Sequence, residues 1–220
     1  MPHYFVLVFE GIYCILISSV MDKKCILCLI LCFGFLSANA QKAEMYFETE
    51  NPIEFDNSKF YLGWSSHPID GFYLQEYFVE GESGENFTRM FSIHLIENKN
   101  TTDNIIDVAL RMKAAELDER KKTDKYCNFT VFKKDDKFLL DFLVSNADSS
   151  NVDKPLVIEW NVYYFKEQKV GQKSYVMISF YSHQASSDKI PSLIRSIPNR
   201  RDAIFTELSE KNIAIKKVKD

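Results

Sequence analysis

A regular alternation of large apolar residues with other residues restricts the possible fold more than any other feature of this chain. Between residues 72 and 78, and again between 91 and 95, aromatic and β-branched side chains recur at every second position. This period is typical of strands in a half-buried sheet. The polar, glycine-containing segment 80–86 lies between the two runs and predicts the turn of a hairpin.

Two further hairpins follow from the same pattern. Strands are predicted at 129–134 and 137–144, on either side of Asp135-Asp136, and at 156–165 and 175–181. In the last turn Gly171 can adopt a positive φ. By contrast, residues 146–153 are predicted to form a long polar loop. Ser65, Ser66 and His67 are expected in a loop before Pro68.

Two helices are predicted among the strands. The first begins near Thr102 or Asp103, either of which can cap it, and extends to about Lys122. The second is expected to follow Pro198, because proline suits the first turn of a helix. The order of strands, helix, strands and helix predicts an α+β domain over residues 41–220, in which helices pack on an antiparallel sheet.

The segment before this domain predicts export. Lys23 and Lys24 precede an apolar run at 25–36, and the small residues Ala38 and Ala40 follow it. This arrangement is typical of a secretory signal peptide at 21–40, with Gln41 as the mature N-terminus. We therefore expect a periplasmic or secreted bacterial protein that touches the membrane only through the signal segment before cleavage.

Residues 1–20 allow two interpretations. The apolar run 4–20 is either an additional membrane segment or an overrun upstream of a true start at Met21. The run contains Glu10 and has no Lys or Arg before it. Since a spanning helix needs about 20 apolar residues and flanking positive charge, the sequence favours the overrun.

Cysteine content and charge exclude several classes of function. Of the five cysteines only Cys127 lies outside residues 1–40, so no disulfide is predicted in the domain. A net charge of −4 argues against nucleic-acid binding. The Arg200-Arg201 pair is interpreted as solvated charge at a helix end. No motif for a cofactor, a catalytic nucleophile or a metal site is present.

A resemblance adds to the fold prediction. Residues 75–77 (Gln-Glu-Tyr) lead through Gly81-Glu82 to 86–88 (Asn-Phe-Thr), just before a strand and a capped helix. This order resembles small exported bacterial proteins of the PsbP/Mog1-like α/β/α sandwich type, over most of residues 55–213. The resemblance implies the sandwich fold and a protein-binding or unassigned role. It implies no catalytic residue.

Several side chains allow a chemical interpretation beside a structural one. His94 and His183 could form an acid–base pair with Asp141 or Glu159, although a structural role is favoured for both. Ser65, Ser66 and His67 lack the frame of a nucleophile elbow. The carboxylates Glu76, Glu80, Glu82 and Glu85 could gather around calcium, but they lack the spacing of a calcium loop.

The aromatic residues leave a choice between core and binding platform. If helices cover both faces of the sheet, Trp160, Tyr164, Tyr175 and Tyr181 are core residues. If one face is open, they form a platform for a peptide, glycan or lipid. The first interpretation is favoured.

The first hairpin is the predicted partner-binding region, because its acidic turn must lie at the periphery of the sheet. The candidate contact residues are Glu76, Tyr77, Glu80, Glu82, Glu85 and Phe87. The sequence therefore predicts a non-enzymatic protein-binding or cell-envelope accessory module with an unknown protein partner. A small-ligand carrier and a hydrolase of unrecognised geometry remain the alternatives.

Overall fold

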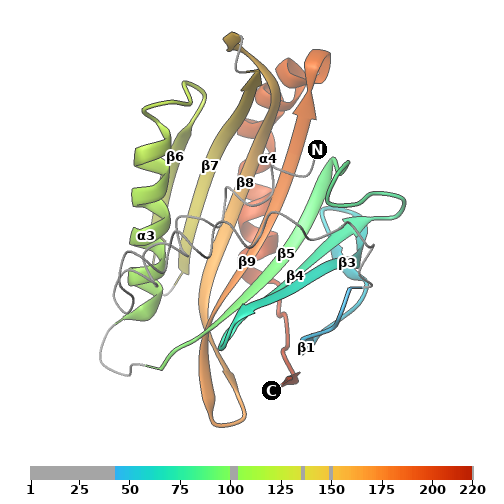
Figure 1. Cartoon of the computed structure of the whole chain (residues 1–220), viewed down its shortest axis with the longest axis vertical. Helices are drawn as coiled ribbons and strands as arrows, with labels where there is room; N and C mark the ends of the chain where they lie inside the picture. The colour runs from blue at the N-terminus through green and yellow to red at the C-terminus, as the bar shows by residue number, and fades with distance from the viewer. Residues whose placement is uncertain (1–42, 100–103, 135–136, 149–150, 220) are drawn as a thin grey trace, which may run out of the picture. The chain divides into compact units, whose positions relative to one another are not determined.

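The computed structural model describes residues 43–99, 104–134, 137–148 and 151–219. The predicted signal peptide, the mature end at Gln41 and the upstream segment 1–20 lie outside these residues. One antiparallel sheet dominates the domain, with the strand order β2-β3-β4-β5-β9-β8-β7-β6 (Figure 1). Its strands are β2 (Ile53–Phe55), β3 (Ser58–Ile69), β4 (Phe72–Val79), β5 (Arg89–Glu97), β6 (Asn128–Lys134), β7 (Lys137–Asp148), β8 (Asn151–Val170) and β9 (Lys173–Ser186).

All three predicted hairpins are confirmed as the pairs β4–β5, β6–β7 and β8–β9. Gly171, in the turn between β8 and β9, has a φ of 61°, as the sequence predicts. A fourth hairpin, β2–β3, turns through Asp56 and Asn57, which both have positive φ. Asp and Asn tolerate this conformation better than most residues.

Three boundaries predicted from sequence are wrong. The second helix, α4 (Ile190–Glu210), begins before Pro198 and contains it, while Pro191 occupies the first turn. Pro198 has no backbone N–H and donates no hydrogen bond within the helix, but apolar residues before and after it, Ile197 and Ile204, are buried. Residues 65–67 lie within β3, and strands β7 and β8 extend into the predicted polar loop, because pairing with neighbouring strands overrides local composition.

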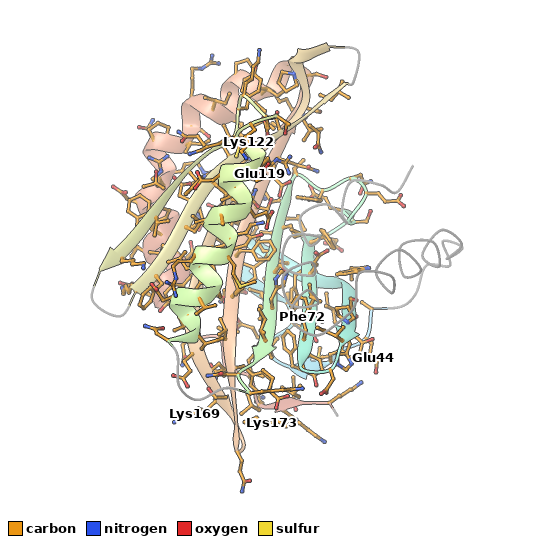
Figure 2. The ribbon with its side chains drawn as sticks, turned by 60° about the vertical axis from the view of Figure 1, so that its left-hand side comes forward. Glu44, Phe72, Glu119, Lys122, Lys169 and Lys173 are labelled. Carbon is orange, nitrogen blue, oxygen red and sulfur yellow. The ribbon has the colours of Figure 1, made fainter. Side chains whose placement is uncertain are left out.

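The two helices cover opposite faces of the sheet. α4 packs on β8 and β9, where Trp160 and Tyr181 belong to its core cluster. The other helix, α3 (Ile105–Arg120), lies over β6, β7, β8 and β9, and its Lys113 lies above the ring of Tyr163. Since neighbouring residues of a strand point to opposite faces, Trp160 and Tyr163 mark two faces, which we call the α4 face and the α3 face. Figure 2 shows α3 in front of the sheet, with Glu119 and Lys122 near its end.

A two-stranded sheet completes the α4 face. β1 (Phe47–Glu48) pairs with β10 (Lys217–Val218), so the two ends of the described domain lie together. The amide of Phe47 donates to Gln75 Oε1 of β4 over 3.0 Å, and Phe47 and Ile213 are fully buried. The antiparallel sheet with a helix packed on each face thus confirms the α+β class for the described part of residues 43–219.

The start of α3 is close to its predicted position. Asn104 caps it by accepting a hydrogen bond from the amide of Asp107, whereas the predicted capping residues Thr102 and Asp103 lie outside the described residues. Leu110 and Leu117 are buried, as the predicted apolar stripe requires. Lys113 is buried beside them, which the sequence did not predict.

Candidate functional site

The loop between β4 and β5 is held in one shape by Glu82. Its carboxylate accepts hydrogen bonds from the amides of Thr88 (3.0 Å) and Arg89 (3.3 Å), and from the Thr88 hydroxyl. A turn between Ser83 and Asn86 adds a backbone bond of 3.0 Å and a bond from the Ser83 amide to Asn86 Oδ1. The loop is therefore ordered by its own polar groups.

Aromatic packing attaches this loop to the sheet. Phe87 is buried, and its ring centroid lies 5.8 Å from that of Phe78. A Cβ at Gly84 would lie 3.7 Å from the Phe78 ring, so this part of the loop lies close to the ring. The Gln184 amide of β9 donates to Thr88 O over 2.9 Å. These contacts fix the base of the loop.

The structure divides the six predicted contact residues into two groups. Glu80 and Glu85 are exposed, and Glu82 is partly exposed while it braces the loop. Glu76, Tyr77 and Phe87 are buried in the sheet or against it. A buried side chain does not reach a partner, so the accessible acidic residues are those of the loop itself.

The buried members have distinct structural roles. Glu76 lies on the α3 face, and burial, followed by repulsion from Glu159, raises the pKa of its carboxyl well above the usual range. Tyr77 lies on the α4 face, where its hydroxyl accepts a hydrogen bond from Gln75. Glu76 is therefore separated from the loop carboxylates that were considered for calcium. Within the described residues, no group of three or more His, Cys, Asp or Glu side chains could hold a metal ion.

Beside the loop, charged and polar residues from four elements form a network around Asp56. Arg200 of α4 lies 2.7 Å from Asp56 Oδ2 and donates to the Tyr181 hydroxyl over 3.0 Å. Arg89 of β5 lies 3.5 Å from the same carboxylate. The guanidinium of Arg200 also stacks over Trp160, 5.6 Å from the ring centroid. This network joins the β2–β3 turn, α4 and the sheet at the end from which the loop projects.

The two histidines considered for acid–base chemistry lie apart in structure and role. His183 Nδ1 accepts from Arg200 Nη1 over 2.7 Å, and burial, with the nearby Arg200 and Arg89 charges, lowers its pKa to about 4. His94 lies on the α3 face, 4.8 Å from the Phe180 ring, and burial, with the Lys113 charge, lowers its pKa to about 3. Both are therefore neutral near pH 7.

The other residues considered for catalysis also have structural partners. Asp141 accepts from Trp160 Nε1 and lies 2.7 Å from Arg201. Glu159 accepts a hydrogen bond from Ser182. Ser65 Oγ accepts from the Glu44 amide over 2.8 Å, and His67 stacks on Tyr73 with 4.3 Å between ring centroids. None of these contacts joins a histidine to a carboxylate or a serine to His67 within the described chain.

The aromatic residues of β8 and β9 are core residues. Trp160, Tyr175 and Tyr181 are at most 1 % exposed beneath α4 and the terminal strands, and Tyr164 packs against the same cluster. The prediction of a covered aromatic face is confirmed for these side chains. They do not form an open platform.

Sequence reasoning missed the Asp56 network. Arg200 and Arg201 were assigned to solvated charge at a helix end, but they lie inside α4 and contact Asp56 and Asp141. The Asp56-Asn57 pair, a hairpin-turn signal, could have indicated the β2–β3 turn. No local signal indicates that Asp56 pairs with Arg200, which is 144 positions away.

The chain belongs to a protein family whose model matches residues 47–213, and this family is uncharacterised. The match covers the sheet, both helices and the loop with its surrounding network. Comparison with curated proteins and with solved structures found no significant match. Within the described residues, no helix is both long enough and apolar enough to cross a membrane.

Proposed function

We propose that this protein is a non-enzymatic protein-binding module, and that it contacts a basic partner through the loop between β4 and β5. The observation that carries this proposal is the bracing of the loop by Glu82, which leaves Glu80 and Glu85 exposed. A loop that is already ordered loses little conformational entropy on binding. Exposed loops on a rigid sheet are also frequent sites of recognition.

The charge of the loop selects the kind of partner. Glu80 and Glu85 are solvent-exposed carboxylates on a chain with a net charge of −4. Lys or Arg side chains of a partner would gain favourable interactions here and faster association at low salt. Arg89 and Arg200 lie nearby and share the single carboxylate of Asp56, which neutralises one of their two positive charges.

The state of the histidines supports binding over catalysis. General acid–base catalysis near neutral pH requires a group whose pKa lies near the working pH. The pKa of His183 is lowered to about 4 and that of His94 to about 3. Neither residue is suited to proton transfer at neutral pH.

The proposal also covers the location of the protein and the relationship of its fold to a known type. We assign the module to the bacterial cell envelope, as a periplasmic or secreted accessory protein released by cleavage before Gln41. We also propose a relationship to the PsbP/Mog1-like sandwich, supported by helices on both faces of an antiparallel sheet. Intact-mass analysis of the protein from its native source tests cleavage, because a retained Met1 or Met21 contradicts export.

The binding proposal is tested by the double variant Glu80→Gln, Glu85→Gln. Both proteins are immobilised and exposed to an envelope extract at one fixed salt concentration, and the captured proteins are cross-linked and identified. The variant is expected to lose the basic proteins that the parent captures. Its unfolding transition should be unchanged, because surface substitutions alter stability by about 0.5 kcal/mol or less.

A matched control has the same change in charge elsewhere. Asp118 and Glu119 of α3 have exposed side chains, 68 % and 72 % accessible, so Asp118→Asn with Glu119→Gln removes two surface carboxylates from a different element. The control should capture the same proteins as the parent. Equal capture by the loop variant and the parent contradicts the proposal.

A further inference from the structure

The two edges of the large sheet differ in how they are protected from pairing with another strand. On one side, β2 covers only the first residues of β3, which pair as Phe55↔Ser58 to Ile53↔Phe60. The rest of β3 contains two irregularities, at Leu62/Trp64 and Ser66/Ile69, and Pro68. Bulges and proline are features that prevent an edge strand from accepting another strand.

The opposite edge strand, β6, has none of these features. It pairs with β7 in unbroken register from Asn128↔Leu143 to Lys134↔Lys137, and within the described residues it pairs with no other strand. Residues 128–132 include no Gly, no Pro and no charged residue. Asn128, Thr130 and Val131 are exposed, with Val131 36 % accessible. β6 is therefore a regular edge whose outer backbone groups can pair with a strand.

Two lysines near this edge are engaged in contacts within the chain. Lys133 forms an ion pair with Asp107 of α3. Lys121, just after α3, lies over the ring of Phe129, 4.0 Å from its centroid. Lysines commonly protect edge strands by projecting into the space that a second strand would occupy. Here Lys133 is directed toward α3, whereas Lys121 lies against the ring of Phe129; Figure 1 shows α3 and β6 in adjacent positions.

We propose that β6 pairs with β6 of a second copy of this chain, in an antiparallel arrangement with its two-fold axis at Val131. This register places Val131 opposite Val131, Thr130 opposite Phe132 and Phe129 opposite Lys133. Two acidic copies repel each other, so they can meet closely only where no like charges oppose. The proposed register brings no two charged residues opposite one another.

The pairing would join the two sheets into one and bring the α3 helices of both copies to the same side. Closed two-fold pairing uses the same surface on both copies, which leaves no β6 edge for further growth. The inference is independent of the binding loop, because β6 and the β4–β5 loop lie on different parts of the sheet.

The test measures the mass of the full chain by light scattering after gel filtration, at low and high micromolar concentration. The parent is expected to shift from monomer to dimer as the concentration rises. Hydrogen exchange at the outward-facing amides of residues 129–133, every second residue, should slow over the same range, because these amides acquire partners in the dimer. A parent that stays monomeric overturns the proposal, and so does a dimer without protection in β6.

Three variants locate the interface. Val131→Glu places two carboxylates opposite each other and should weaken dimerisation by about tenfold or more. Val131→Thr keeps a β-branched residue and should dimerise like the parent. Tyr61→Glu adds the same charge at an exposed position of β3, which is 42 % accessible, and should also dimerise normally. Circular dichroism verifies that each variant is folded. Dissociation by Tyr61→Glu in place of Val131→Glu would move the interface to β3 and refute the proposal.

Discussion

The α4 face and the α3 face of the same sheet are packed with different chemistry. On the α4 face Phe91, Ile93 and Val162 are fully buried, and the buried Ser179 and Gln75 are polar but uncharged. On the α3 face the corresponding layer includes buried ionisable groups: Glu76 is 1 % exposed, and Lys113 is 3 % exposed. Both faces have a helix, but the buried carboxylate of the α4 face, Asp141, lies 2.7 Å from Arg201 and accepts a hydrogen bond from Trp160.

Partners compensate the charges on the α3 face in part. Lys113 Nζ lies 2.7 Å from Glu116 Oε1 and 5.4 Å from the centroid of the Phe142 ring. Burial nevertheless lowers the pKa of Lys113 and raises that of Glu76. Glu76 Oε1 has no hydrogen-bond partner among the described residues. The comparison teaches that the α4 face supplies stability, whereas the α3 face includes groups that cost free energy to bury.

The largest expected effect is on the α4 face. Trp160→Ala removes a side chain that is 1 % exposed, donates to Asp141 and stacks with Arg200. Truncation of a buried aromatic residue costs about 3–5 kcal/mol. We expect a loss of this size in the free energy of unfolding, measured in urea. Trp160→Phe, which keeps most of the apolar volume, should lose clearly less, and equal losses would contradict the cavity explanation.

The next effect is a pH dependence from the α3 face. The pKa of His94 is lowered from its ordinary 6.5 to about 3 by burial. Below pH 6.5 the unfolded chain takes up a proton that the folded chain does not, so stability contributed by neutral His94 is lost as the pH falls toward 3. The expected loss is about 1.4 kcal/mol per pH unit within that window.

The variant His94→Phe separates the pH dependence due to His94 from that due to the buried carboxylates. The raised pKa values of Glu76 and Glu159 have the opposite sign, because their stabilising protonated form is lost as the pH rises above 4.5. His94→Phe keeps a ring beside Phe180 and removes only the histidine contribution. The free energy of unfolding of the parent should therefore fall relative to that of the variant as the pH falls from 6 to 4. A difference that does not change with pH contradicts the assignment.

The smallest expected effect is the removal of the buried ion pair. Lys113→Met with Glu116→Gln keeps the approximate volumes and removes both charges beneath α3. Replacement of a buried pair by uncharged residues is often neutral or stabilising, so the free energy of unfolding should change by no more than about 1 kcal/mol or should rise. Lys113→Met alone leaves Glu116, which is 18 % exposed, without its cation and should be less stable than the double variant. The reverse order would show that the pair is a net source of stability.

Much of the fold could be predicted from the sequence because its signals are local. Alternation over a few residues predicted the strands of all three hairpins, and Gly171 indicated the turn between β8 and β9. The acidic turn of the first hairpin was placed at the periphery because unpaired carboxylates are costly to bury, and Glu80 and Glu85 are exposed. These inferences depend only on neighbours in the chain.

The tertiary structure decided what the local pattern could not. Alternation shows that Glu76 and Tyr77 point to opposite faces, but not that an element buries both. The same limit applies to Lys113. Lysine is usually a surface residue, but this side chain points from α3 to the sheet and lies over two aromatic rings. Asp56 and Arg200 are 144 positions apart and meet only when α4 crosses the sheet. Burial and long-range pairing depend on where whole elements pack, and that information is distributed over the entire chain.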